Sequence, residues 1–129
     1  MEAVLKVGGS LAEDSTILTK LCQKLGALAE AHRIAIVPGG GEFADTVRKL
    51  DKAYRLSNMV AHKMAILAMD QYGFLLSDIA PKSYVSRSLE EISKSAKGTL
   101  PIILPSKIMF REDPLEHSWD VTSDTIAAY

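Results

Sequence analysis

The chain has 129 residues, of which 47% are hydrophobic and 24% charged, and its formal net charge is −1. This length fits one domain with its own core, and the balanced charge gives no reason to expect binding to nucleic acid or to an acidic membrane surface. The N-terminus lacks the basic segment and apolar core of a signal peptide, and the single cysteine, Cys22, cannot form an internal disulfide. We therefore expect a soluble cytoplasmic protein that does not enter a membrane.

The first hydrophobic run, residues 3–7, ends in the sequence Gly8-Gly9-Ser10. The run is short and apolar, which predicts a buried strand, and the two glycines permit a sharp turn that approaches a ligand closely. Backbone N–H groups at such a turn before a helix bind anions. Lys6 adds a full charge, and a lysine buried in an apolar strand would need an anionic partner. The stretch predicts a phosphate-binding turn; the alternative is a lysine that reaches solvent before an ordinary glycine turn.

The second hydrophobic run, residues 34–37, is followed by Pro38 and three glycines, Gly39, Gly40 and Gly41. Its apolar residues are consecutive, which is typical of a parallel strand covered on both faces. A helix is predicted to follow from Glu42, so the order strand, glycine turn, helix occurs twice. Parallel strands end at the same edge of a sheet, so we expect the two turns side by side, where α/β proteins bind ligands. Neither turn matches the dinucleotide-binding pattern or the P-loop pattern.

The remaining patterns predict further helices and strands of an α/β fold. Four helices are expected: from Asp14 or Ser15 to about His32, from Asn58 to Gly73, after a capping box of Ser88 and Glu91, and from Thr122 or Ser123. Strands are expected at residues 84–85 and 100–104. A loop is expected from Phe110 to Ser118. The helix from Asn58 is apolar on most sides, which indicates a place in the core or at the interface of a homodimer.

Two features indicate that the sequence is part of a longer protein. The predicted strands are few for a sheet covered on both faces. The last predicted helix is apolar and begins only a few residues before Tyr129, the end of the sequence.

Three stretches, in this order, resemble the amino acid kinase family. They are residues 6–11 (Lys-Val-Gly-Gly-Ser-Leu), 37–41 (Val-Pro-Gly-Gly-Gly) and 122–128 (Thr-Ser-Asp-Thr-Ile-Ala-Ala). The family includes acetylglutamate, glutamate, aspartate, uridylate and isopentenyl phosphate kinases. The resemblance implies a three-layer αβα sandwich with a mainly parallel sheet, of the acetylglutamate kinase type. It also implies that residues 1–129 are the N-terminal, acceptor-binding part, without the nucleotide-binding half.

Within the family, several stretches look most like an archaeal branch, the aminomethylfuran phosphate kinases of methanofuran biosynthesis. These stretches are residues 41–45, 56–58, 62–66, 104–107 and 116–119. The branch implies ATP-dependent conversion of a phosphomonoester into a diphosphate. An acetylglutamate, glutamate or uridylate kinase is the nearest alternative, and a non-catalytic ligand-binding module without the ATP half is the alternative of another class.

The resemblance also implies roles for the residues of the three stretches. Lys6 would neutralise charge on the transferring phosphoryl group, the amides of Gly8 and Gly9 would hold phosphate oxygens, and Ser10 would add a hydroxyl donor. Asp124 would orient the catalytic lysine, or would only be an aspartate favoured in the first turn of a helix.

The second turn and the third stretch would bind the acceptor. The residues expected to contact it are Gly39, Gly40, Gly41, Arg48, Trp119, Thr122 and Ser123. The alternative for Arg48 is a solvated arginine on a helix surface, and the alternative for Trp119 is a packing residue. The implied cofactors are ATP and Mg²⁺, with Mg²⁺ bridging the nucleotide phosphates and no metal site made by the protein alone. The acceptor would be a small phosphate or carboxylate compound.

Overall fold

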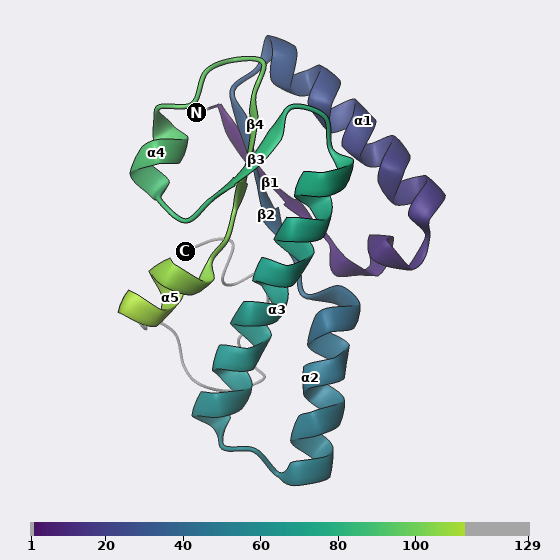
Figure 1. The fold of residues 1–129 in the computed structure, drawn as a ribbon, viewed down its shortest axis with the longest axis vertical. Coiled ribbons are helices and arrows are strands. Elements are labelled where there is room, and N and C mark those ends of the chain that lie inside the picture. The colour runs from purple at the N-terminus through teal and green to yellow at the C-terminus, as the bar shows by residue number, and fades with distance from the viewer. Residues whose placement is uncertain (1, 113–129) are drawn as a thin grey trace.

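The computed structural model describes residues 2–112, which form a four-stranded sheet with helices around it (Figure 1). The strands lie in the order β1-β2-β4-β3, and every pairing is parallel. Their bounds are Ala3–Val7 for β1, Ile34–Pro38 for β2, Ser83–Ser86 for β3 and Leu100–Ile103 for β4. The predicted α/β fold with a parallel sheet is confirmed.

Five α-helices and one 3-10 helix accompany the strands within the described part of the chain. They are η1 (Gly9–Glu13), α1 (Ser15–Ala31), α2 (Gly41–Tyr54), α3 (Asn58–Ile79), α4 (Leu89–Ser93) and α5 (Ser106–Glu112). The expected caps of α1 and α3 are present: the Asp14 carboxylate accepts from the Thr16 and Ile17 amides, and the Ser57 hydroxyl accepts from the Val60 amide. None of these helices is long and apolar enough to cross a membrane.

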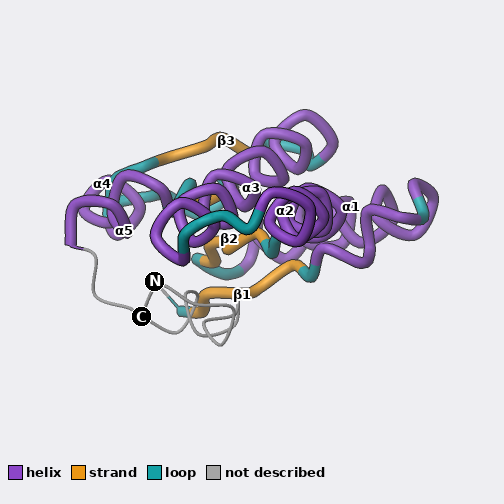
Figure 2. The backbone as a smooth tube through the Cα atoms, turned by 90° about the horizontal axis from the view of Figure 1, so that it is seen from below, coloured by secondary structure: helices purple, strands orange, loops and turns teal. Residues whose placement is uncertain are grey.

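Helices cover both faces of the sheet, as the alternation of residues along β2 shows. Ile34 and Ile36 pack with α1 and the C-terminal half of α3, whereas Ala35 and Val37 pack with α4, α5 and the middle of α3. Figure 2 shows α1 and the α4–α5 pair on opposite sides of the strands. This arrangement is the predicted three-layer sandwich. Cys22 lies in the α1 side of the core, where burial raises the pKa of its thiol.

Strand β1 is less buried than predicted. Ala3, Leu5 and Val7 face the α1 side of the core, but Val4 and Lys6 are exposed on the other face of the strand. The strand lies at the edge of the sheet, and the apolar cluster on the α4–α5 side, as described for residues 2–112, includes no residue of β1. The prediction that Lys6 is buried among apolar residues is therefore wrong.

The end of α3 and the predicted capping box also differ from expectation. Helix α3 continues past Gly73 to Ile79 because Leu76 and Ile79 extend its packed face. Only half of the predicted capping box forms: the Ser88 hydroxyl accepts from the Glu91 amide, but the Glu91 carboxylate accepts a hydrogen bond from the Ser86 hydroxyl instead.

The loop predicted from Phe110 to Ser118 is helical over its first three residues, because they belong to α5. A carboxylate from another helix caps α5: Asp70 of α3 is buried and accepts hydrogen bonds from the Ser106 amide (3.2 Å) and the Ser106 hydroxyl. These partners are 36 residues apart. No local sequence pattern therefore indicates this cap.

Replacing Asp70 with alanine should lower the free energy of unfolding by about 1–3 kcal/mol, because two donors of Ser106 lose their acceptor in a buried place. Urea denaturation of the variant measures this. The matched control is Asp78→Ala, which removes an exposed carboxylate from the same helix. An equal loss in the two variants would contradict the capping role.

Candidate functional site

The two glycine turns are in direct contact at the carboxyl edge of the sheet. Val7 pairs with Pro38 at the ends of β1 and β2, and the Gly39 amide donates to the Val7 carbonyl over 2.9 Å. A Cβ on Gly9 would lie 2.0 Å from the Gly41 nitrogen, which is closer than real Cβ atoms approach. The turns are adjacent as predicted, and their backbones come closer than any side chain at position 9 would permit.

Helix α2 begins inside the second turn. Gly41 is its first residue and has φ of +53°, a left-handed conformation that glycine adopts without strain. The N-cap residue, Gly40, has no side chain, so it offers no capping group to the first amides of the helix. The partial positive charge of the α2 N-terminus is therefore directed at the second turn.

The helix after the first turn begins several residues later, at Ser15, as its sequence predicts. The 3-10 helix Gly9–Glu13 separates the turn from α1, and Asp14 caps the N-terminus of α1. The dipole of α1 is thus not directed at Gly8 and Gly9. Within residues 2–112, the second turn adjoins the N-terminus of an α-helix and the first does not, so the expected contribution of a helix dipole to the first turn is not found.

Lys6 extends along the second turn. Its Cε lies 3.5 Å from the position that a Cβ on Gly39 would occupy, and the same position lies 3.0 Å from the Gly9 nitrogen. The space that a side chain at position 39 would fill is therefore bordered by the Gly9 backbone nitrogen and by the aliphatic part of the Lys6 side chain. Because Lys6 is exposed, its ammonium group does not require a buried counter-ion, and its position beside both turns is what supports a role in binding.

Tyr72 is a residue of this site that belongs to none of the predicted motifs. It lies on α3 and is completely buried, and its hydroxyl donates to the Gly8 carbonyl over 2.9 Å. Burial raises the pKa of Tyr72 to about 12. The available signal was a tyrosine in a largely apolar helix, because a buried tyrosine hydroxyl usually has a hydrogen-bond partner.

The other predicted site residues within the described range lie further from the contact of the two turns. Ser10 follows the first turn directly and is exposed. Arg48 lies two helical turns along α2, about 10 Å from Gly41 along the axis, and donates to Asp45 over 2.8 Å. Trp119, Thr122, Ser123 and Asp124 lie outside the described residues.

The glycine turns fit a phosphate better than they fit a bare metal ion. Anions are bound by backbone N–H groups that no side chain covers, and the close approach of Gly9 to Gly41 leaves no room for a side chain at position 9. Residues 2–112 contain no group of three or more histidine, cysteine, aspartate or glutamate side chains arranged to hold a metal.

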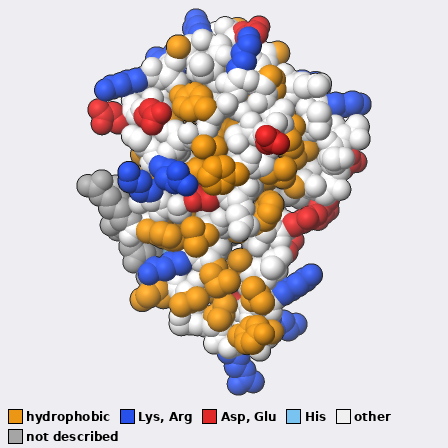
Figure 3. Space-filling view, in the orientation of Figure 1, with side chains coloured by type: hydrophobic (Ala, Val, Ile, Leu, Met, Phe, Trp, Pro, Cys, Tyr) orange, Lys and Arg blue, Asp and Glu red, His pale blue; other side chains and the backbone are white. Residues whose placement is uncertain are grey.

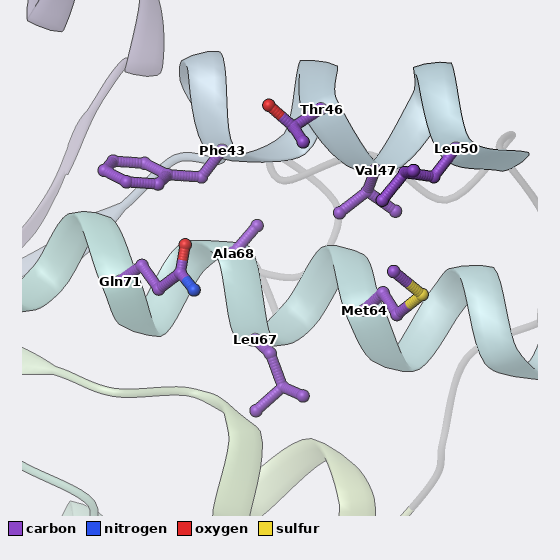
Figure 4. A pocket seen from close by; sticks show the side chains of 8 residues that line it. All are labelled: Phe43, Thr46, Val47, Leu50, Met64, Leu67, Ala68 and Gln71. Carbon is purple, nitrogen blue, oxygen red and sulfur yellow. The ribbon is translucent and has the colours of Figure 1, made fainter.

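A separate groove of about 320 Å³ lies between α2 and α3. The two helices project from the sheet as an antiparallel pair (Figure 1), and the side chains in the groove are mainly apolar (Figure 4). Its lining residues are Phe43, Thr46, Val47, Leu50, Met64, Leu67, Ala68 and Gln71. The groove has no concentration of charge and does not include the glycine turns.

Comparison with known proteins identifies relatives of the whole chain. Residues 1–129 match the sequence profile of the amino acid kinase family. A curated relative, [5-(aminomethyl)furan-3-yl]methyl phosphate kinase of Methanocaldococcus jannaschii, is 40% identical over 126 residues, which are 98% of this chain and 58% of the relative. The chain thus spans little more than half the length of this relative.

Solved structures of uridylate kinases share the fold. That of Archaeoglobus fulgidus superposes with a TM-score of 0.69 at 24% identity, over 80% of this chain and 50% of the other. That of Ureaplasma parvum has a TM-score of 0.65 at 14% identity, over 98% of this chain and 62% of the other. Because the family profile matches every residue, this chain belongs to the amino acid kinase family.

Proposed function

We propose that this chain is the acceptor-binding part of an ATP-dependent kinase that converts a phosphomonoester, [5-(aminomethyl)furan-3-yl]methyl phosphate, into a diphosphate. The observation that carries the proposal is the backbone contact between the two glycine turns, with Lys6 beside them. Two phosphate-binding turns this close can hold the donor and the acceptor phosphates of one transfer. The name of the 40% identical relative supports the choice of acceptor.

The chemistry asks for positioning and for neutralisation of charge. An oxygen of the acceptor phosphate forms a bond to the terminal phosphorus of ATP, the bond from that phosphorus to ADP breaks, and ADP leaves with the electron pair. The attacking oxygen is already anionic, so no general base is needed. The turns fit this requirement, because the groups that they present to a phosphate are backbone amides and the Lys6 ammonium group. The turns would hold the phosphates in line, and Lys6 would offset their mutual repulsion.

The residues expected to hold the phosphates of ATP are Lys6, Gly8, Gly9 and Ser10. ATP, when bound with Mg²⁺, supplies the transferred phosphoryl group, and Mg²⁺ takes most of its ligands from phosphate and water rather than from protein. The second turn, with the α2 N-terminus behind it, would receive the acceptor phosphate. Asp124 would keep Lys6 charged and oriented.

An ADP-release assay on the full-length gene product tests the proposal. The acceptors to compare are [5-(aminomethyl)furan-3-yl]methyl phosphate, UMP and N-acetylglutamate. We expect kcat/KM for the furan phosphate to exceed the others by about 100-fold or more, which corresponds to about 2.7 kcal/mol of discrimination. A preference for UMP or N-acetylglutamate would replace the proposed acceptor. Tight binding of the furan phosphate without ADP release would instead favour the non-catalytic binding module.

We also propose that the chain forms a homodimer through α3. Val60, Leu67 and Phe74 are between 44% and 47% exposed and are spaced seven residues apart, so they form one apolar stripe along the helix. On the face of the molecule drawn in Figure 3, hydrophobic side chains gather over the projecting α2–α3 pair. The stripe and the α2–α3 groove lie side by side. The stripe of one copy can therefore pack into the groove of a second copy, and the reverse, which makes the surface self-complementary.

Leu67→Glu should convert the dimer into a monomer, because it places a charge in the centre of an apolar interface. Sedimentation velocity at several concentrations measures the change, which we expect to be about 100-fold or more in the dissociation constant. The control is Leu28→Glu, a similarly exposed leucine on α1. A wild-type chain that stays monomeric at high concentration would contradict the proposed homodimer.

A further inference from the structure

The peptide group between Gly8 and Gly9 has a fixed orientation in the structure. Its carbonyl oxygen, on Gly8, accepts the hydrogen bond of the buried Tyr72 hydroxyl over 2.9 Å. The Leu11 amide also points at this oxygen, over the longer distance of 3.4 Å. The peptide is trans, so its N–H, on Gly9, points in the direction opposite to the carbonyl. The Tyr72 hydroxyl therefore determines that the Gly9 N–H points away from the core.

We infer that Tyr72 is a positioning residue that holds the Gly8–Gly9 peptide with its N–H turned toward bound phosphate. The inference rests on the proposed function of the first turn as a phosphate-binding element. Its basis is the juxtaposition described above: the Gly9 nitrogen borders the space left by the missing Gly39 side chain, and Lys6 borders the same space. An N–H that faces this space adds a donor next to the lysine.

A peptide between two glycines needs such a restraint. Glycine occupies both signs of φ at little cost, so a Gly-Gly peptide can rotate and exchange the directions of its carbonyl and its N–H. A carbonyl turned toward the phosphate would present negative charge to an anion. The Tyr72 hydroxyl opposes this rotation, because rotation would take the Gly8 carbonyl away from it. The buried hydroxyl would then have no acceptor, which is costly in the core.

Tyr72 is itself held firmly. It is completely buried in the core cluster between the sheet and α1, and its ring lies 6.4 Å from the ring of Phe43. Phe43 belongs to the first turn of α2, two residues after Gly41. The same aromatic pair thus joins the first glycine turn to the helix that starts in the second. Burial raises the pKa of Tyr72, so its hydroxyl stays protonated and able to donate near neutral pH.

Tyr72→Phe removes the hydroxyl and keeps the ring. In the full-length enzyme we expect kcat to fall about 10-fold with KM for the acceptor changed less than about twofold, a smaller effect than the 100- to 1,000-fold typical of removing a donor itself. The control is Tyr84→Phe, which removes the hydroxyl of a half-buried tyrosine on β3. Unchanged kcat in Tyr72→Phe, in an active wild-type enzyme, would overturn the inference.

A second readout does not depend on activity. In NMR spectra of the full-length protein, the Gly9 amide signal should shift on titration with inorganic pyrophosphate, and Tyr72→Phe should weaken pyrophosphate binding about fivefold or more. Tyr84→Phe should titrate like the wild type. Equal titrations of all three proteins would overturn the inference. If the wild type binds pyrophosphate in this way but transfers no phosphate to any acceptor, the proposed function fails while the role of Tyr72 stands.

A measurement on the wild type keeps the inference testable if Tyr72→Phe does not fold. The Tyr72 hydroxyl proton should exchange slowly with solvent, and bound pyrophosphate should slow its exchange further, because the ligand stabilises the same peptide orientation. Exchange that is unaffected by pyrophosphate would count against a link between the hydroxyl and phosphate binding.

Discussion

Replacing Lys6 with alanine should lower kcat of the full-length enzyme by about 100- to 10,000-fold, because the transferring phosphoryl group loses the cation that offsets its charge. Lys6 lies beside both glycine turns, with its Cε close to the space that the missing Gly39 side chain leaves. The charge it supplies is therefore next to the point where the two phosphates would meet. The effect should fall on kcat more than on KM for the acceptor, since charge spreads during the transfer itself.

Stability should change little in this variant. Lys6 is exposed on an edge strand, and substitutions of exposed residues usually alter the free energy of unfolding by no more than about 0.5 kcal/mol. Steady-state kinetics and urea denaturation of Lys6→Ala separate the two effects. The control is Lys24→Ala, an exposed lysine on α1. Full activity of Lys6→Ala would remove Lys6 from the proposed mechanism and favour the interpretation of a lysine that simply reaches solvent.

Gly9→Ala should be the most destabilising single-methyl change at the site. The new Cβ would lie 2.0 Å from the Gly41 nitrogen and 2.1 Å from its Cα, and both neighbours are backbone atoms that cannot move aside alone. The two turns must separate, so we expect a loss of about 3 kcal/mol or more in unfolding free energy, together with a loss of phosphate binding.

Gly8→Ala is the matched comparison for folding. A Cβ on Gly8 would meet no heavy atom within 4 Å, and Gly8 has an extended backbone (φ −66°, ψ 144°) that alanine adopts readily. Its unfolding free energy should therefore stay within about 1 kcal/mol of the wild type, or rise slightly because alanine restricts the unfolded chain. Equal destabilisation of Gly8→Ala and Gly9→Ala in urea would show that contact between the turns does not limit stability.

The elements that sequence predicts well in this chain are those set by local patterns. The consecutive apolar residues of β2 indicate a strand covered on both faces, and its side chains indeed pack into two clusters on opposite faces. Asp14 and Ser57 cap the helices that follow them because a cap needs only the next three residues. The adjacency of the glycine turns follows from parallel pairing of the strands before them.

The features that sequence did not predict depend on residues far apart in the chain. Tyr72 and Gly8 are separated by 64 residues, and Asp70 and Ser106 by 36, so neither hydrogen bond leaves a local pattern. The exposure of Lys6 depends on which elements cover its face of β1, and a run of apolar residues does not encode that. The predicted roles of Asp124 and Trp119 stay predictions, because both lie outside the described residues.

Helix α3 touches the ends of three strands within a single helical turn. Asp70 binds the segment after β4, Tyr72 binds the turn after β1, and Gly73 packs so closely that a Cβ there would lie 2.6 Å from Leu104 and 3.4 Å from Pro38, at the end of β2. A small slide of this helix would displace all three strand ends at once. Substitutions at these positions should therefore show strong non-additivity in double-mutant cycles, so that damage at one of them alters what the others contribute.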